Sequence, residues 1–279
     1  MSYASILVHI EGGSPSSEPR LRLAASLARR FNAALMGVAA GAVQMPPVDA
    51  FGGAVFIGDI MAEEEKQILA ELAAAEEKFR ADPATQGLTL DWRSAVDLPT
   101  QVLTRESRSA DLIVMGNEFD FLRSGVYRSA DPGEVIMGAG RPVLVVPPGT
   151  ETLKAENVVL GWKDSREARR AMWDAGPLLK AAQSVHVVEI TSEEESRPAT
   201  ERIDDVVRHL GRHGVKAQGE VRTQRKGSPA EELVLFAEQR DADLIVVGGY
   251  GYARLREWIF GGVTRDLLKS SPKCCLFSH

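Results

Sequence analysis

Glycines follow a short apolar run near the C-terminal end of the chain, at a spacing that suits phosphate binding. Gly248-Gly-Tyr-Gly251 comes directly after the apolar run 244–247, and Gly261-Gly-Val-Thr264 opens a predicted helix nine residues later. Glycine lets the backbone approach a ligand closely, and a helix N-terminus offers unpaired N–H groups and a partial positive charge. The pattern predicts a phosphate site. The alternative, which the residues alone do not exclude, is that these glycines serve tight turns and packing.

An internal repeat indicates which elements position this loop. Three segments of the first half recur in the same order in the second half: Ile6–Glu11 as Val158–Lys163, Ala110–Gly116 as Ala242–Gly248, and Arg141–Val146 as Ser271–Leu276. Self-similarity of this kind indicates a duplicated unit. Turn-type residues 147–151 follow an apolar run and predict the boundary, which gives domains 1–149 and 150–279.

Short apolar runs alternate with helical periodicity in both halves. In the second half a helix is predicted to open near Asp164 or Ser165, and Ser228-Pro-Ala-Glu231 is a capping box. Leu244–Val247 has the continuous apolar character of a parallel strand buried on both faces. The alternation predicts α/β, doubly wound domains, in which ligands bind beyond the carboxyl ends of the strands. The first half carries extra residues, predicted as a Pro/Gly-rich loop over Gly41–Met61.

The sequence G-x-x-G, nine residues, then G resembles the ATP-binding signature of the universal stress protein family, and the two halves together resemble a tandem member. The resemblance implies that each half is a five-stranded parallel sheet with helices on both faces, an adenine-nucleotide alpha-hydrolase-like fold. It also implies phosphates and ribose on the glycine loop and adenine near the end of the first strand. Pairing through the last strands implies contact between Val143–Val146 and Cys274–Phe277.

Carried onto this sequence, the family motif gives a partial site in the second half. The motif glycines fall on Gly248, Gly251 and Gly261, while Gly262 stands where the motif has Ser or Thr and so lacks the hydroxyl. The acidic position at the end of the first strand falls on Lys163, which could meet a phosphate but accepts no hydrogen bond. The predicted ATP-binding residues are Val247, Gly248, Gly251, Gly261, Gly262, Val263, Thr264 and Lys163.

The first half departs further from the motif. Phe119 stands where the second glycine should be, and no clear G-[S/T] step follows, although Asp131-Pro-Gly-Glu134 is predicted to start the next helix. Glu11 falls on the acidic position. An aromatic residue in the phosphate loop fills space rather than binding an anion, so ATP is expected in the C-terminal half only.

Several other classes of function are disfavoured. A net charge of −6 argues against nucleic acid as a partner, and no apolar stretch approaches the roughly 20 residues of a membrane span. The N-terminal residues do not resemble a signal peptide, so a cytoplasmic location is expected. Adjacent Cys274 and Cys275 are predicted to be core residues rather than a redox pair. His209 and His213 lie four residues apart but lack a third ligand, so a solvated helix face is expected.

Aromatic and basic residues surround the glycine loop. Tyr250, Tyr252, Trp258 and Phe260 are predicted to cover the loop and pack against the other half, with a role of Arg254 or Arg256 in anion binding as the alternative.

Three functions remain in contention. The leading one is a stress-response protein, not an enzyme, whose second half senses an adenine nucleotide while the two halves pair within the chain. The second is an interaction module that binds no nucleotide, which Lys163 and Gly262 favour. The third, a weak ATPase or nucleotide-α-phosphate hydrolase, is disfavoured because the sequence places no general base or metal-binding carboxylate pair near the loop. Association of two chains into a homodimer is left open.

Overall fold

The structure is a computed structural model that describes residues 2–12, 14–44, 54–118, 125–223, 227–250 and 262–279. The elements of the first half are β1 (Ser5–His9), α1 (Ser17–Phe31), β2 (Ala34–Gly41), α2 (Ala54–Ala81), β3 (Leu90–Val96), α3 (Pro99–Glu106), β4 (Leu112–Gly116), α4 (Gly125–Arg128), α5 (Pro132–Gly138) and β5 (Val143–Val146), with short 3-10 turns at Pro83–Thr85 and Ser107–Ser109. Those of the second half are β6 (Asn157–Gly161), α6 (Arg166–Asp174), α7 (Gly176–Ala181), β7 (Ser184–Thr191), α8 (Ser196–Arg212), β8 (Ala217–Thr223), α9 (Pro229–Gln239), β9 (Leu244–Gly248), α10 (Gly262–Ser270) and β10 (Cys274–Ser278).

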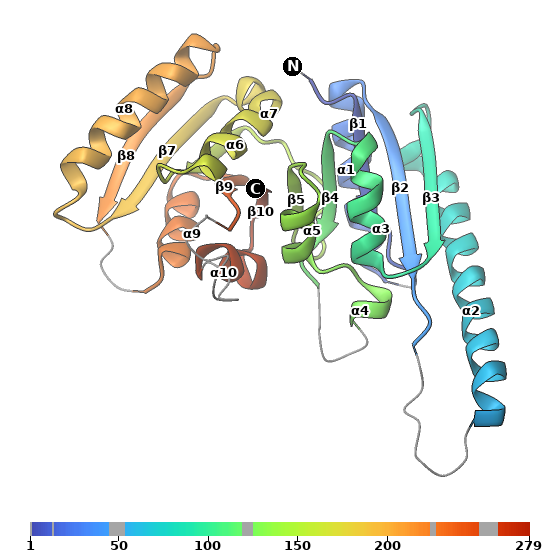
Figure 1. Cartoon of the computed structure of the whole chain (residues 1–279). Helices are drawn as coiled ribbons and strands as arrows, with labels where there is room; N and C mark the ends of the chain where they lie inside the picture. The colour runs from blue at the N-terminus through green and yellow to red at the C-terminus, as the bar shows by residue number, and fades with distance from the viewer. Residues whose placement is uncertain (1, 13, 45–53, 119–124, 224–226, 251–261) are drawn as a thin grey trace.

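All ten of these strands belong to one sheet, in the order β3-β2-β1-β4-β5-β10-β9-β6-β7-β8. Within each half the five strands are parallel, and the second half repeats the strand order of the first. The halves join where β5 and β10 pair antiparallel, with Leu144 opposite Leu276 (Figure 1). The α/β fold and the pairing of the last strands predicted from the sequence are therefore confirmed.

Side chains that alternate along the strands build two apolar layers, one on each face of the sheet. One layer is covered by α1, α2, α6, α7 and α8, and the other by α3, α5, α9 and α10. The adjacent cysteines illustrate the alternation, because Cys274 belongs to the first layer and Cys275 to the second. Both thiols are free and buried, and burial raises the pKa of each to about 12. They are core residues, as predicted.

Local capping explains where three helices begin. The Ser165 hydroxyl accepts from the Ala168 N–H at the start of α6, and the Asp131 carboxylate accepts from two N–H groups at the start of α5. At α9 both bonds of the predicted capping box between Ser228 and Glu231 are present. Each predicted helix start is confirmed, and such side-chain acceptors stabilise a helix by about 1 kcal/mol each.

The prediction of a loop over 41–61 is wrong at both ends. Gly41 is the last residue of β2, and α2 already begins at Ala54 and runs along the sheet edge at β3 (Figure 1). The prolines and most glycines of the stretch precede Ala54, whereas 54–61 is dominated by residues compatible with a helix and continues directly into the Ala- and Glu-rich run that follows. Residues 45–53 lie outside the described part of the chain.

Candidate functional site

A cleft of about 760 Å³ opens at the carboxyl ends of β6, β7 and β9. Its volume is in the range of small-molecule sites, and it lies where doubly wound sheets bind ligands. It is lined by the segments after β6 and β7, by the first turn of α6, by the end of β9 and by the first turn of α10. Of the predicted site residues, the cleft brings together Lys163, Val247, Gly248, Gly262, Val263 and Thr264. The other two, Gly251 and Gly261, lie outside the described residues.

Gly248 is a glycine because helix α6 approaches it very closely. A Cβ atom on Gly248 would lie 2.6 Å from the Ala168 nitrogen and 2.7 Å from the Glu167 carbonyl carbon, both backbone atoms that cannot move aside. The packing explanation raised for these glycines therefore holds at Gly248. The same approach brings the first turn of α6 beside the glycine loop, so packing and site construction coincide here.

The two halves meet behind the loop. A Cβ on Gly249 would lie 2.7 Å from Ile136 of α5, and one on Gly133 would lie 2.5 Å from the Tyr250 hydroxyl oxygen. Burial, together with the charge of Asp131, raises the pKa of Tyr250 to about 12. Tyr250 thus packs against the first half, as predicted. The corresponding predictions for Tyr252, Trp258 and Phe260, and the alternative for Arg254 and Arg256, fall outside the described residues.

Thr264 uses its hydroxyl to hold the loop. The side chain is buried, and its oxygen accepts from the Tyr250 N–H at 3.4 Å, where Tyr250 has a left-handed φ of 45°. At the start of the same helix, Gly262 has open space around it, with no described atom within 4 Å of a built Cβ. Gly262, Val263 and Thr264 line the cleft, so the described part of α10 begins at the cleft, and a helix N-terminus favours an anion.

Charged side chains give the cleft a mixed character. Carboxylates pair with arginines in three places: Asp164 with Arg169, Glu167 with Arg166, and Glu189 with Arg202. Lys163 is exposed and, among the described residues, has no ion-pair partner. The cleft therefore offers an ammonium group and helix N–H groups to an anion, and carboxylate oxygens to hydrogen-bond donors.

Sequence reasoning missed two of these carboxylates. Glu189 lies two residues before the end of β7, and two nitrogens of Arg202 of α8 donate to its carboxylate at 2.5 and 3.2 Å. Glu167 lies in the first turn of α6 and is 2% exposed. Glu167 thus places one carboxylate beside the glycine loop that the sequence did not indicate, whereas the absence of a general base or a metal-binding carboxylate pair stays a prediction. The available signal was the Ser165 cap, which places Glu167 at the start of a helix after the first strand, but an acidic residue there is also a common helix feature.

At the matching place of the first half, charged side chains lie in contact with one another, although the nitrogens of Arg20 and His9 have no hydrogen-bond partner among the described residues. Glu11 lies two residues after β1, and its carboxylate contacts buried Arg20 at 3.6 Å and His9 at 3.4 Å, while the Ser129 hydroxyl donates to it at 3.0 Å. A Cβ on Gly116 would lie 2.9 Å from an Arg20 nitrogen. Glu11, predicted as the equivalent of the family's acidic residue, is thus engaged by its own chain. Phe119 lies outside the described residues.

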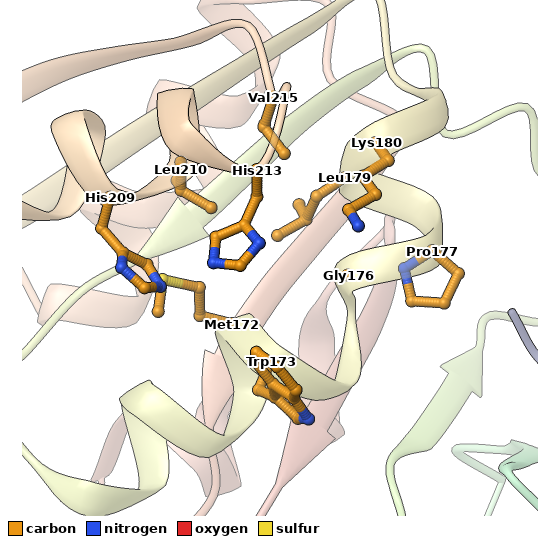
Figure 2. Close-up of a pocket in the computed structure, with 10 residues that line it drawn as sticks. All are labelled: Met172, Trp173, Gly176, Pro177, Leu179, Lys180, His209, Leu210, His213 and Val215. Carbon is orange, nitrogen blue, oxygen red and sulfur yellow. The ribbon is translucent and has the colours of Figure 1, made fainter. Parts of the chain in front are cut away.

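His209 and His213 lie beside a second, much smaller hollow of about 70 Å³ (Figure 2). Their ring centroids are 4.8 Å apart, and Trp173 meets His213 edge-on at 6.1 Å. The hollow is too small for a typical ligand. No group of three or more potential metal ligands gathers within the described ranges, and the absence of a metal stays a prediction.

Comparison with known proteins places the chain in a family. The model of the universal stress protein family matches residues 154–278. Universal stress protein MJ0577 of Methanocaldococcus jannaschii is 30% identical over 127 residues, which cover 44% of this chain and 76% of the relative. The chain belongs to the universal stress protein family.

Two further similarities extend beyond the C-terminal half. Universal stress protein Slr1230 of Synechocystis is 22% identical over 163 residues, which cover 58% of this chain and 55% of that protein. The crystal structure of a universal stress protein from Archaeoglobus fulgidus superposes with a TM-score of 0.68 at 17% identity, covering 98% of this chain and 95% of the other. At that identity the superposition demonstrates the shared fold across both halves. Among the described helices, none is long and apolar enough to cross a membrane.

Proposed function

We propose that this universal stress protein binds an adenine nucleotide, with ATP as the first candidate, in the cleft of its C-terminal half and acts as a sensor rather than an enzyme. The observation that carries the proposal is the convergence of Lys163, Gly248 and the first turn of α10 on one cleft. The helix N-terminus and the ammonium group supply positive potential for phosphates. The glycine spacing that resembles the ATP-binding signature of the family supports the same ligand.

A nucleotide-free interaction module is the second candidate. Two residues favour it. The packing of α6 already explains why residue 248 is a glycine, and Gly262 lacks the hydroxyl of the family motif. In this function the ten-stranded sheet would present surfaces to a partner protein, and the cleft would stay empty. Because β5 and β10 already pair within the chain, a homodimer would have to use another surface, such as the outer strands β3 and β8.

An enzymatic role receives less support from the chemistry of the cleft. Although burial raises the pKa of Glu167, the hydrogen bond and positive charge of Arg166, together with the polar groups at the start of α6, outweigh burial and lower the pKa. A carboxylate with a lowered pKa is a poor general base, because catalytic bases work best with a pKa near the operating pH. We therefore propose that the protein acts in the cytoplasm and is not an enzyme.

Titration calorimetry of the intact chain with ATP, ADP and AMP tests the proposal. We expect saturable heat with at least one nucleotide, and weaker binding for Lys163→Ala, because the variant removes an ammonium group from the cleft. The absence of heat at millimolar nucleotide would reject the sensor and favour the interaction module. Phosphate release above a buffer control, abolished by Gly251→Trp, would instead support the weak ATPase.

A further inference from the structure

Glu167 carries a carboxylate oxygen that has no hydrogen-bond partner in the part of the chain that the structure describes. The residue is 2% exposed, and its Oε1 accepts from the Arg166 Nε at 2.7 Å. Its Oε2 is buried, and no donor among the described residues reaches it. An unsatisfied buried polar atom destabilises a folded protein, and charged groups do so most, so such an atom calls for an explanation.

The position of Glu167 connects it to the candidate site. It lines the cleft, and its backbone and Cβ lie within 3 Å of where a Gly248 Cβ would be. Lys163 lies between β6 and α6, and its side chain supplies a positive charge but no hydrogen-bond acceptor. A ligand that occupies the cleft therefore has one buried acceptor beside the glycine loop, and Glu167 provides it.

The first half has a charged side chain of opposite sign at the position that matches Glu167. There Arg20, in the first turn of α1, lies beside Gly116 as Glu167 lies beside Gly248. Arg20 faces Glu11, so opposite charges meet within the half. In the second half the signs are exchanged, with lysine after the strand and glutamate in the helix, and the ion pair of Glu167 is with Arg166 instead.

We propose that Glu167 Oε2 accepts a hydrogen bond from a hydroxyl or amino group of the nucleotide in the cleft and thereby selects ligands that carry this donor. The inference rests on the proposed nucleotide binding and adds the residue that reads the ligand's donor. A site built to hydrogen-bond a ligand group rejects analogues that lack the group, because its own buried polar atom is then left unpaired.

Calorimetry with the intact chain and four probes tests this assignment: ATP, 2′-deoxy-ATP, 3′-deoxy-ATP and inosine triphosphate. The first two analogues each lack one ribose hydroxyl, and the third lacks the amino group of the base. We expect one of the three to bind the wild-type protein about 10-fold to 100-fold more weakly than ATP. Glu167→Gln should weaken ATP by a similar factor, yet change the affinity for that one analogue much less.

Two results would overturn the assignment. One is that all three analogues bind the wild type as tightly as ATP does. The other is that Glu167→Gln lowers the affinity for every probe by the same factor, which indicates a merely structural role. Glu106→Gln is the matched control, because Glu106 is another buried carboxylate that pairs with arginines, but it lies in the first half, away from the cleft. It should leave all four affinities unchanged.

The same experiment separates this inference from the function on which it depends. If the wild type binds none of the four probes, both proposals fail. If it binds ATP but shows no dependence on Glu167, only the assignment of Glu167 fails. Melting temperatures of both variants, measured without nucleotide, show whether a lost affinity reflects a folding defect.

Discussion

The two halves build the same strand ends and then use them in opposite ways. After β1, Glu11 and buried Arg20 lie 3.6 Å apart, so the chain supplies the counter-charge of each from within the half. After β6, Lys163 is exposed to a cleft, and one buried oxygen of Glu167 has no hydrogen-bond partner within the described ranges. Two copies of one fold can therefore differ in the charges at the same strand ends, with the sheet left intact.

The glycine that ends the fourth strand of each half shows the same contrast in packing. Gly248 is fixed by backbone atoms of α6, whereas Gly116 faces the end of the flexible Arg20 side chain. Gly248 thus packs against the backbone of a helix that lines the cleft, whereas Gly116 packs against a side chain.

The largest expected effect comes from removing the internal counter-charge. Glu11→Ala leaves the Arg20 guanidinium, 2% exposed, without its carboxylate, and should lower the free energy of unfolding by about 3–5 kcal/mol. Lys163→Ala, at the matching exposed position, should change it by less than about 0.5 kcal/mol. Urea denaturation of both variants measures the difference.

The double variant Glu11→Ala/Arg20→Met is the control for that comparison. Removing both charges should recover much of the loss, because no uncompensated buried charge remains. Equal stability of the single and double variants would contradict the description of the first half as a closed ion pair.

The second prediction compares the two glycines. Gly248→Ala forces a Cβ against backbone atoms at 2.6 and 2.7 Å and should cost about 2–3 kcal/mol of stability. Gly116→Ala meets only the Arg20 guanidinium at 2.9 Å, which can shift, and should cost less than about 1 kcal/mol. Equal losses in chemical denaturation would show that the two strand ends are packed alike.

Local sequence pattern predicted most of the fold. The repeat and the apolar runs predicted the sheet, because buried parallel strands leave a strong local signal. The caps at Ser165 and Ser228 predicted helix starts for the same reason. The pairing of Val143–Val146 with Cys274–Phe277 was implied by the resemblance to the family. The loop prediction failed at Ala54, where glycines and prolines upstream were extended too far along the chain.

The charge arrangement could not be predicted from local pattern. Arg20 and Glu167 read as ordinary residues of a first helical turn, and their roles arise only when the sheet brings them beside Gly116 and Gly248. Burial of a charge depends on such long-range packing, which spacing along the chain does not encode. The sequence located the glycine loop, but it did not identify which side chain closes or completes each site.

The third prediction concerns acid stability and again separates the halves. Burial, with a contribution from the charge of Arg20, lowers the pKa of His9 from 6.5 to about 3, whereas the matching residue of the second half is Gly161 and cannot titrate. As the pH falls below about 6.5, the unfolded chain binds a proton that the folded chain excludes. His9 should therefore reduce stability by about 1.4 kcal/mol per pH unit between about pH 6 and pH 3.5.

Denaturation curves collected across this range for His9→Gln should show a shallower acid slope than the wild type. The exposed His213 provides the matched control variant, His213→Gln. A slope for His9→Gln identical to that of the wild type would mean that His9 is protonated in the folded protein.

The smallest expected effect is a gain of ATP affinity in the C-terminal half. Gly262→Ser places a hydroxyl where the family motif carries one, and the space around Gly262 accepts a Cβ without contact to any described atom. Gly262 is a residue of helix α10, and serine adopts helical backbone. One added hydrogen bond to phosphate should tighten ATP binding about 3-fold to 10-fold in calorimetry. Gly262→Ala adds the same Cβ without the hydroxyl and should not reproduce the gain. If neither variant changes the affinity for ATP, phosphate does not bind at the first turn of α10. The C-terminal half would then resemble the first half in function, despite the different charges at its strand ends.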